Sequence, residues 1–173
     1  MALNFAVAPR ALKLAGALAL GLALSACASN PNANDANAGA GGFNAAGAAT
    51  PGSPQDFVVN VGDRVFFETD STDLTPQAIA TLDKQAQWLA RFPRYSFTLE
   101  GHADERGTRE YNFSLGARRA QTVRDYLASR GVAGTRMRTV SYGKERPVAV
   151  CNDISCWSQN RRVVTVLDAG AGV

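Results

Sequence analysis

Cys27 directly follows a segment whose residue pattern is not that of a folded globular domain. Upstream of it, Arg10 and Lys13 are followed by an apolar run from Leu14 to Leu24 and then by small residues. This order of charge, short apolar run and small residues is typical of an export signal. The run has only about half of the ~20 residues that a membrane-spanning helix needs, so we expect no permanent transmembrane anchor. The fold has to be formed by residues downstream of Cys27.

The four residues from Leu24 to Cys27 resemble a bacterial lipobox, at which the signal is cut and the cysteine becomes the lipidated first residue. We therefore predict a signal peptide over residues 1–26 and lipidation of Cys27. An ordinary signal peptide that happens to end at a cysteine is the alternative. Resemblance to bacterial lipoproteins implies several acyl chains on Cys27, and more than one chain is needed for stable membrane attachment. The same resemblance implies transport to the outer membrane, because Ala28, the residue after the cysteine, is not an aspartate.

Residues 27–56 are predicted to be the lipidated N-terminus and a flexible linker. They are rich in Asn, Ala, Gly and Pro and show no apolar periodicity. Such a composition cannot bury enough surface to offset the conformational entropy of the chain. A flexible coil of ~30 residues has a root-mean-square span of ~30 Å, so residues 57–173 could reach away from a membrane. A spacer without any geometric role is the alternative.

The charge balance argues against nucleic acid as a partner. The whole chain has 18 Lys and Arg residues and 15 Asp and Glu residues, and loss of Arg10 and Lys13 leaves 16 against 15. A nucleic-acid-binding domain would need a strong basic excess, which the mature protein lacks. The length allows one domain of ordinary size with appendages.

The pattern of residues 57–173 predicts four strands and two long helices. Strands are expected at Arg64–Phe67, Tyr95–Leu99, Met137–Tyr142 and Arg162–Leu167. Helices are expected from Thr75 to Arg91 and from about Arg109 to Arg130, with their apolar residues at helical spacing. The inward positions of the two helices are predicted to be Ile79, Leu82, Ala86, Leu89, Leu115, Ala120, Val123 and Leu127.

The order β-α-β-α-β-β predicts an α/β fold of the α+β two-layer type, with the helices packed on one mixed sheet. Thr75 and Pro76 mark the start of the first helix, and Pro93 stops it. Gly131 ends the second helix. The order of the strands in the sheet stays open.

Residues 100–120 contain polar residues and glycines at fixed spacing. The run comprises Gly101-His-Ala-Asp104, Gly107, Asn112, Leu115 and Arg119-Ala120. It resembles the motif of the OmpA-like peptidoglycan-binding domain family, and Asn160-Arg-Arg-Val163 resembles that family's closing motif. The resemblance covers about residues 57–168 and implies a domain that binds peptidoglycan.

Two variants of the motif resemble the lipoprotein branch of that family in particular. They are Gly-His-Ala-Asp-Glu-Arg-Gly, over residues 101–107, and Ser-Tyr-Gly-Lys-Glu-Arg-Pro, over residues 141–147. This likeness implies membership of the Tol–Pal system, a part in cell division and envelope integrity, and TolB as a periplasmic partner. The residues by themselves do not indicate TolB binding.

The residue types in the motif suit a doubly charged ligand. Asp104 follows a strand end, while Asn112 and Arg119 are seven residues apart and lie on one stripe of a helix. An acid, an amide and an arginine around one concavity would fit the ammonium and carboxylate of meso-diaminopimelate in the peptidoglycan stem peptide. We expect Asp104 to bind the ammonium, Arg119 the carboxylate, and Asn112 to support them. Alternatively, Asp104 caps its loop and Arg119 forms a surface ion pair with Glu110 or Asp104.

Three further residues are weaker candidates for the same pocket. Arg162 could close it or be a solvated residue at a strand edge. Glu68 and Thr69 lie in the loop Glu68-Thr69-Asp70 after the first strand, which is a plausible pocket wall through its backbone N–H groups. Gly107 is expected to provide a positive φ in a turn rather than a ligand contact.

His102 is the only histidine in the chain, and it allows an alternative hypothesis for the function, namely an enzyme. A peptidoglycan hydrolase could pair it with an acidic residue, or with Cys151 or Cys156 as the nucleophile. We favour a structural histidine whose ring is satisfied by hydrogen bonds. One histidine cannot form a multi-histidine metal centre, and no cysteine spacing matches a zinc site. We therefore expect a binding protein, not an enzyme, with neither cofactor nor metal.

Cys151 and Cys156 remain once Cys27 is lipidated. In an oxidising periplasm, two cysteines so close in sequence should pair. We predict a small disulfide-closed loop in a turn-like stretch ahead of the last strand.

Overall fold

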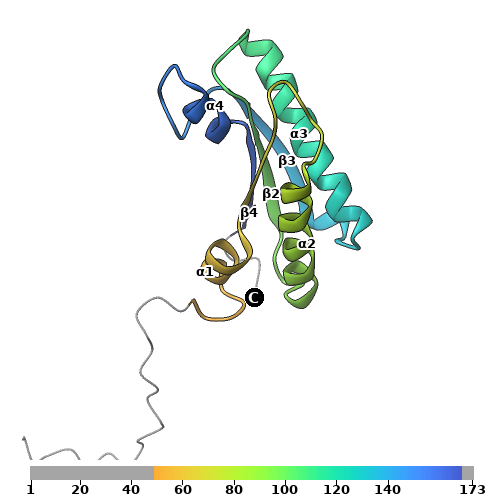
Figure 1. Cartoon of the computed structure of the whole chain (residues 1–173). Coiled ribbons are helices and arrows are strands. Elements are labelled where there is room, and N and C mark those ends of the chain that lie inside the picture. Colours follow the sequence, from red (N-terminus) through yellow and green to blue (C-terminus); the bar gives the residue numbers. More distant parts are fainter. Residues whose placement is uncertain (1–48, 169–173) are drawn as a thin grey trace, which may run out of the picture. The chain divides into compact units, whose positions relative to one another are not determined.

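The computed structural model describes residues 49–168. The predicted signal peptide, Cys27 and most of the predicted linker lie outside the described residues. The sheet has four strands, β1 (Arg64–Phe66), β2 (Phe97–His102), β3 (Met137–Gly143) and β4 (Arg162–Leu167). The two long helices, α2 (Pro76–Arg91) and α3 (Arg109–Ser129), cover one face of it (Figure 1). The predicted two-layer α/β fold is confirmed.

The strand order, which sequence left open, is β1-β4-β2-β3. β2 and β3 are parallel, and β4 is inserted antiparallel between β1 and β2, so the sheet is mixed. β2 starts later than predicted, at Phe97, and continues to His102, which pairs with Gly143 across an irregularity in the register. The carboxyl ends of β2 and β3 therefore meet at one edge, beside the start of α3.

Local capping explains where the long helices begin and end. The Thr75 side chain accepts a hydrogen bond from the Ala78 N–H, and Thr108 does the same for Tyr111. An oxygen at this position satisfies one of the N–H groups that a helix start leaves unpaired. Gly131, with φ of 90°, ends α3 in the left-handed conformation that glycine adopts without strain. Both helices match their predicted bounds.

The core lies between the sheet and the two helices. Its fully buried members include Leu82, Leu89, Phe97, Leu99, Ala120, Val123, Leu127 and Val163. Of the predicted inward positions, Ile79 is only half-buried, and its neighbour Ala78 lies in the core instead.

The folded part begins earlier than predicted. A short helix, α1 (Pro54–Asp56), and a helical turn over Phe57–Val61 precede β1. The Tyr95 hydroxyl donates to the Gly52 carbonyl at 2.8 Å, and Trp88 donates its indole N–H to Asp56 at 2.8 Å. Gly52 and Asp56, whose surroundings have a linker-like composition, are thus held against the domain by polar contacts.

A further helix that was not predicted lies between β3 and β4. α4 (Ile154–Asn160) occupies the stretch that was expected to be a turn. Asp153 caps it by accepting a hydrogen bond from the Ser155 N–H at 2.8 Å. The structure pairs Cys151 with Cys156, whose Cα atoms are 5.7 Å apart, so the bridge joins the start of α4 to the loop before it.

Two glycines let α3 approach the sheet closely. A Cβ atom on Gly101 would lie 1.9 Å from the carbonyl oxygen of Gly116, and one on Gly116 would lie 2.5 Å from the Ser141 hydroxyl. Backbone therefore packs directly on backbone where β2 crosses α3. This contact sets the height of the first half of α3 above the sheet.

We predict that Gly101→Ala lowers the free energy of unfolding by about 3 kcal/mol or prevents folding, because the added methyl group meets backbone that cannot rotate away. Gly134→Ala is the matched control, since a Cβ there meets only the side-chain end of Arg124 at 3.4 Å. Urea denaturation of both variants measures the difference. Equal losses in the two variants would contradict this account of the packing.

Candidate functional site

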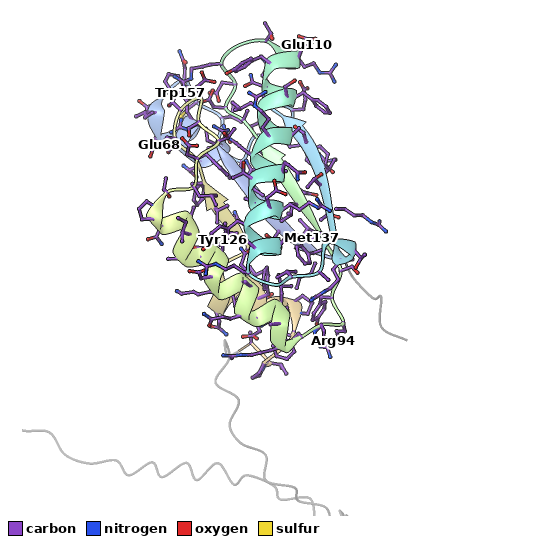
Figure 2. The ribbon with its side chains drawn as sticks, turned by 90° about the vertical axis from the view of Figure 1, so that its right-hand side faces the viewer. Glu68, Arg94, Glu110, Tyr126, Met137 and Trp157 are labelled. Carbon is purple, nitrogen blue, oxygen red and sulfur yellow. A yellow bond between two sulfur atoms is a disulfide. The ribbon has the colours of Figure 1, made fainter. Side chains whose placement is uncertain are left out.

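A cavity of about 210 Å³ lies where the end of β2, the start of α3 and the loop after β1 meet. It is lined by Thr69, Asp70, Asp104, Arg106, Gly107, Tyr111, Asn112, Leu115 and Arg119. Figure 2 shows Glu68, Trp157 and Glu110 at this end of the molecule; they belong to the loop after β1, to α4 and to α3. The predicted trio of Asp104, Asn112 and Arg119 is thus brought together, and Thr69 joins it.

Two predicted site residues do not line this cavity. Glu68 contributes its backbone carbonyl to the loop that forms one wall, but its side chain is not part of the lining. Arg162 donates to the carbonyl oxygens of Asn160, at 3.3 Å, and Arg146, at 3.2 Å. Strand alternation carries its side chain to the sheet face opposite α3.

Asp104 is nearly buried and is held by two arginines. Arg106 Nη2 lies 2.6 Å from Asp104 Oδ2, and Arg106 Nε and its backbone N–H both donate to Oδ1 at 3.2 Å. Arg161 Nη1 approaches Oδ2 at 3.4 Å. Burial disfavours the charged carboxylate, but these hydrogen bonds outweigh it, and the pKa of Asp104 is lowered. The carboxylate is therefore ionised at neutral pH.

Arg106 is a site residue that the sequence reasoning missed. Its side chain is 41% exposed, and its guanidinium carbon lies 4.2 Å from the centre of the Trp157 ring on α4. Gly107, with φ of 82°, turns the loop beyond it. The only sequence signal was its place two residues after Asp104, which does not say that its side chain folds back.

Asn112 supports this loop from below. Its amide nitrogen donates to the Arg106 carbonyl at 2.6 Å, and the side chain is buried. The positive φ predicted for Gly107 is confirmed. Asn112 therefore fixes the loop that carries Arg106 and follows Asp104.

Arg119 is completely buried and holds three segments together. Its Nε donates to Ser71 O at 2.8 Å, Nη1 to His102 O at 2.9 Å and Nη2 to Glu68 O at 3.0 Å. The alternative of a surface ion pair with Glu110 is therefore wrong. Burial, with the nearby charge of Arg161, lowers the pKa of Arg119 to about 10, so it stays a cation at neutral pH.

Tyr111, at the cavity mouth, was also missed, whereas Asp70 belongs to the loop that was predicted as a pocket wall. The Tyr111 hydroxyl donates a hydrogen bond to the Asp70 carboxylate, which connects α3 to the loop after β1. Asp70 has φ of 55°, the only positive φ at a non-glycine residue in the described part of the chain. The hydrogen bond from Tyr111 to this carboxylate raises the pKa of the tyrosine.

His102 lies apart from the cavity. Its ring is buried, and within residues 49–168 neither ring nitrogen has a hydrogen-bond partner, so the expectation of a satisfied ring is wrong. The nearest carboxylate oxygen, of Glu100, is 3.9 Å from Nε2. Cys151 and Cys156 are joined to each other, so neither is a free thiol here.

Among the residues that the structure describes, no group of three or more His, Cys, Asp or Glu side chains is arranged to hold a metal ion. No helix within residues 49–168 is long and apolar enough to cross a membrane.

Comparison with known families places residues 66–161 in the OmpA family. A protein of Rhizobium meliloti named peptidoglycan-associated lipoprotein is 76% identical over 127 residues, which cover 73% of this chain and 72% of that protein. The protein of the same name from Brucella melitensis is 70% identical over 127 residues, covering 73% and 75%. The chain belongs to the peptidoglycan-associated lipoproteins of the OmpA family.

Solved structures agree with this family assignment. The peptidoglycan-associated lipoprotein of Burkholderia pseudomallei matches with a TM-score of 0.60 at 42% identity, covering 61% of this chain and 90% of that one. The C-terminal domain of Helicobacter pylori MotB matches with a TM-score of 0.59 at 23% identity, covering 63% and 86%, and shows the shared fold alone.

We predict that His102 titrates near pH 4. Burial and the charges of Arg162 and Arg146 lower its pKa from 6.5 to about 4, while the Glu100 carboxylate opposes them from 3.9 Å. The unfolded chain binds the proton more readily than the folded protein. Through this residue, the free energy of unfolding is therefore highest above pH 6.5 and falls by about 3 kcal/mol as the pH is lowered to about 4.

His102 is the only histidine, so its ring resonances in the NMR spectrum are unambiguous. A titration midpoint near 6.5 would show that neither burial nor the arginines act on the ring as described.

Proposed function

We propose that this domain binds peptidoglycan non-covalently, through the diaminopimelate of the stem peptide, and tethers the outer membrane to the cell wall. Family membership supports peptidoglycan as the ligand, since the relatives are named for that association. The observation that carries the finer assignment is one small cavity that contains both Asp104 and Arg119. A ligand that presents an ammonium and a carboxylate together matches this pairing.

In this proposal Asp104 accepts the ligand's ammonium. A carboxylate has about four acceptor positions, and Arg106 and Arg161 already use them all. The ammonium therefore displaces side-chain bonds of Arg106, whose partly exposed arm can rotate while it stays against Trp157. Loss of these Arg106 bonds offsets part of the gain from the new charge-assisted bond, so the affinity of a single site is modest. Many lipid-anchored copies facing one wall compensate for that through avidity.

Arg119 faces the ligand's carboxylate with the donors that remain to it. Each terminal nitrogen of a guanidinium carries two N–H groups, and each of these nitrogens donates one of them to a backbone carbonyl, of His102 or of Glu68. The side chain has no exposed surface, so the second N–H on each nitrogen reaches a carboxylate only when the loop after β1, which is bonded to the guanidinium, shifts. Asn112 acts by holding the loop, and the Thr69 hydroxyl contributes to the wall. We assign no ligand contact to Arg162 or to the Glu68 side chain.

We infer binding without cleavage. The hydrolase alternative needs His102 beside a nucleophile or a second acid at the ligand. Its ring lies outside the cavity lining, and the two candidate cysteines are paired with each other. Both observations support a tether.

The remaining parts of the proposal rest on the sequence and the family. Lipidation of Cys27 would anchor the chain in the outer membrane, with the domain in the periplasm. Association with TolB, and a role in envelope constriction at division as part of the Tol–Pal system, follow from the resemblance to that system.

We predict that Asp104→Asn weakens binding of the soluble domain to purified sacculi at least tenfold. The change keeps the shape and removes the charge, and a hydrogen bond to a charged group contributes about 1.5–3 kcal/mol. Co-sedimentation, with and without free diaminopimelate as competitor, measures the effect. Asp125→Asn is the control, because it makes the same change at an exposed position farther along α3.

Circular dichroism has to show that Asp104→Asn is folded. A folded variant with wild-type affinity would remove Asp104 from the site.

Binding should also vary little with pH in the neutral range. Because hydrogen bonds from Arg106 lower the pKa of Asp104, its carboxylate stays charged down to mildly acidic conditions. We expect the affinity for diaminopimelate to stay within about twofold between roughly pH 5 and 8. Isothermal titration calorimetry measures this, and a fall in affinity centred between these values would indicate a different acidic group.

A further inference from the structure

A second and larger cavity, of about 590 Å³, lies on another side of the first turns of α3. Successive helix residues point about 100° apart, and Asn112 lines the first cavity while Phe113 lines the second. The second cavity is bounded on its other side by the end of β3 and the residues after it, including Lys144 and Glu145.

This cavity presents an exposed aromatic side chain among polar groups. Phe113 is 56% exposed, and its backbone is held by the Ser141 hydroxyl, which donates to its carbonyl at 2.6 Å. A Cβ atom on Gly143 would lie 2.9 Å from the Phe113 nitrogen, so β3 and α3 are in direct contact beneath the ring. Because the backbone of Phe113 is already held, a ligand has to order only the two side-chain torsions of the ring.

Hydrogen-bonding groups surround the ring. Ser114, Glu110 and an ion pair between Arg109 and Glu145, with 3.1 Å between Nε and Oε1, contribute donors and acceptors to the lining. A flat apolar surface beside such groups suits a sugar, whose ring has an apolar C–H face and a rim of hydroxyl and amide groups. A purely apolar or purely charged ligand would leave one of these two kinds of surface unmatched.

The two cavities share a wall. Lys144 Nζ, on the side of the second cavity, donates to the carbonyl of Gly107 at 2.6 Å and to that of Glu105 at 3.2 Å. Gly107 lines the first cavity. The loop between Asp104 and α3 is thus the partition, and one polymer could occupy both sides of it.

We infer that the second cavity binds an amino sugar of the glycan strand to which the bound stem peptide is attached. This inference rests on the proposed function. The two cavities lie on different sides of α3. An α-helix with its side chains is about 10 Å across, so the spacer between the two bound groups has to cover a distance of this order. A spacer of about two extended residues with its linkage covers roughly 7–10 Å. The stem peptide between diaminopimelate and sugar has this length.

The test compares a soluble disaccharide-peptide muropeptide with the same peptide without its sugars. Phe113→Ala should weaken binding of the muropeptide about threefold to tenfold and leave binding of the bare peptide unchanged. Phe113 is exposed, so the variant should fold. Phe66→Ala is the matched control, because Phe66 is 46% exposed and lies on β1, outside the lining of both cavities.

Calorimetry gives the affinities, and amide shifts of Phe113, Gly143 and Lys144 that appear only with the muropeptide would support the site directly. Equal losses for the two ligands, or no loss for either, would overturn it. Failure of the proposed function gives a different result, since Asp104→Asn would then leave binding of both ligands intact.

Discussion

The buried guanidinium of Arg119 is the interaction on which this end of the molecule depends. It donates to one carbonyl at the end of β2 and to two in the loop after β1. It therefore connects α3, β2 and this loop, which are far apart in sequence. A buried cation is tolerated only when its donors are satisfied. Those carbonyls satisfy the donors that face the protein, and the charge remains at the base of the cavity. The same residue is therefore a structural clamp and, in the proposed function, the source of positive charge for the ligand's carboxylate.

The rest of the site is arranged around this fixed charge. Asp104 lies across the cavity from it, and Arg106 covers the carboxylate with an arm that rests on Trp157. Trp157 belongs to α4, whose start is closed by the Cys151–Cys156 bridge. A helix that looked like a turn in the sequence thus positions the aromatic partner of a residue at the ligand site. A helix carries Arg119 and Asn112, whereas Arg106 lies on a loop and is partly exposed.

Several parts of the fold could be predicted because they depend on local chemistry. Thr75, Pro76 and Gly131 act within one helical turn, so the bounds of the long helices follow from neighbouring residues. The motif also identified Asp104, Asn112 and Arg119 as members of one cavity. Arg106 and Tyr111 were missed because their partners, Trp157 and Asp70, are 51 and 41 positions away in the sequence. Arg162 was misplaced because one step along a strand moves a side chain to the other face of the sheet.

The sequence by itself determined the class of fold, the family, and the residue types that gather at one end of β2. These follow from periodicity, capping and a long motif, all of which are read along the chain. Only the tertiary structure decided the strand order, the commitment of Arg119 to backbone carbonyls, and the division of the surface beside α3 into two cavities. Each of these depends on which distant segments come into contact, and the close approach of Gly101 to Gly116 that sets this packing is made by backbone atoms that every residue shares.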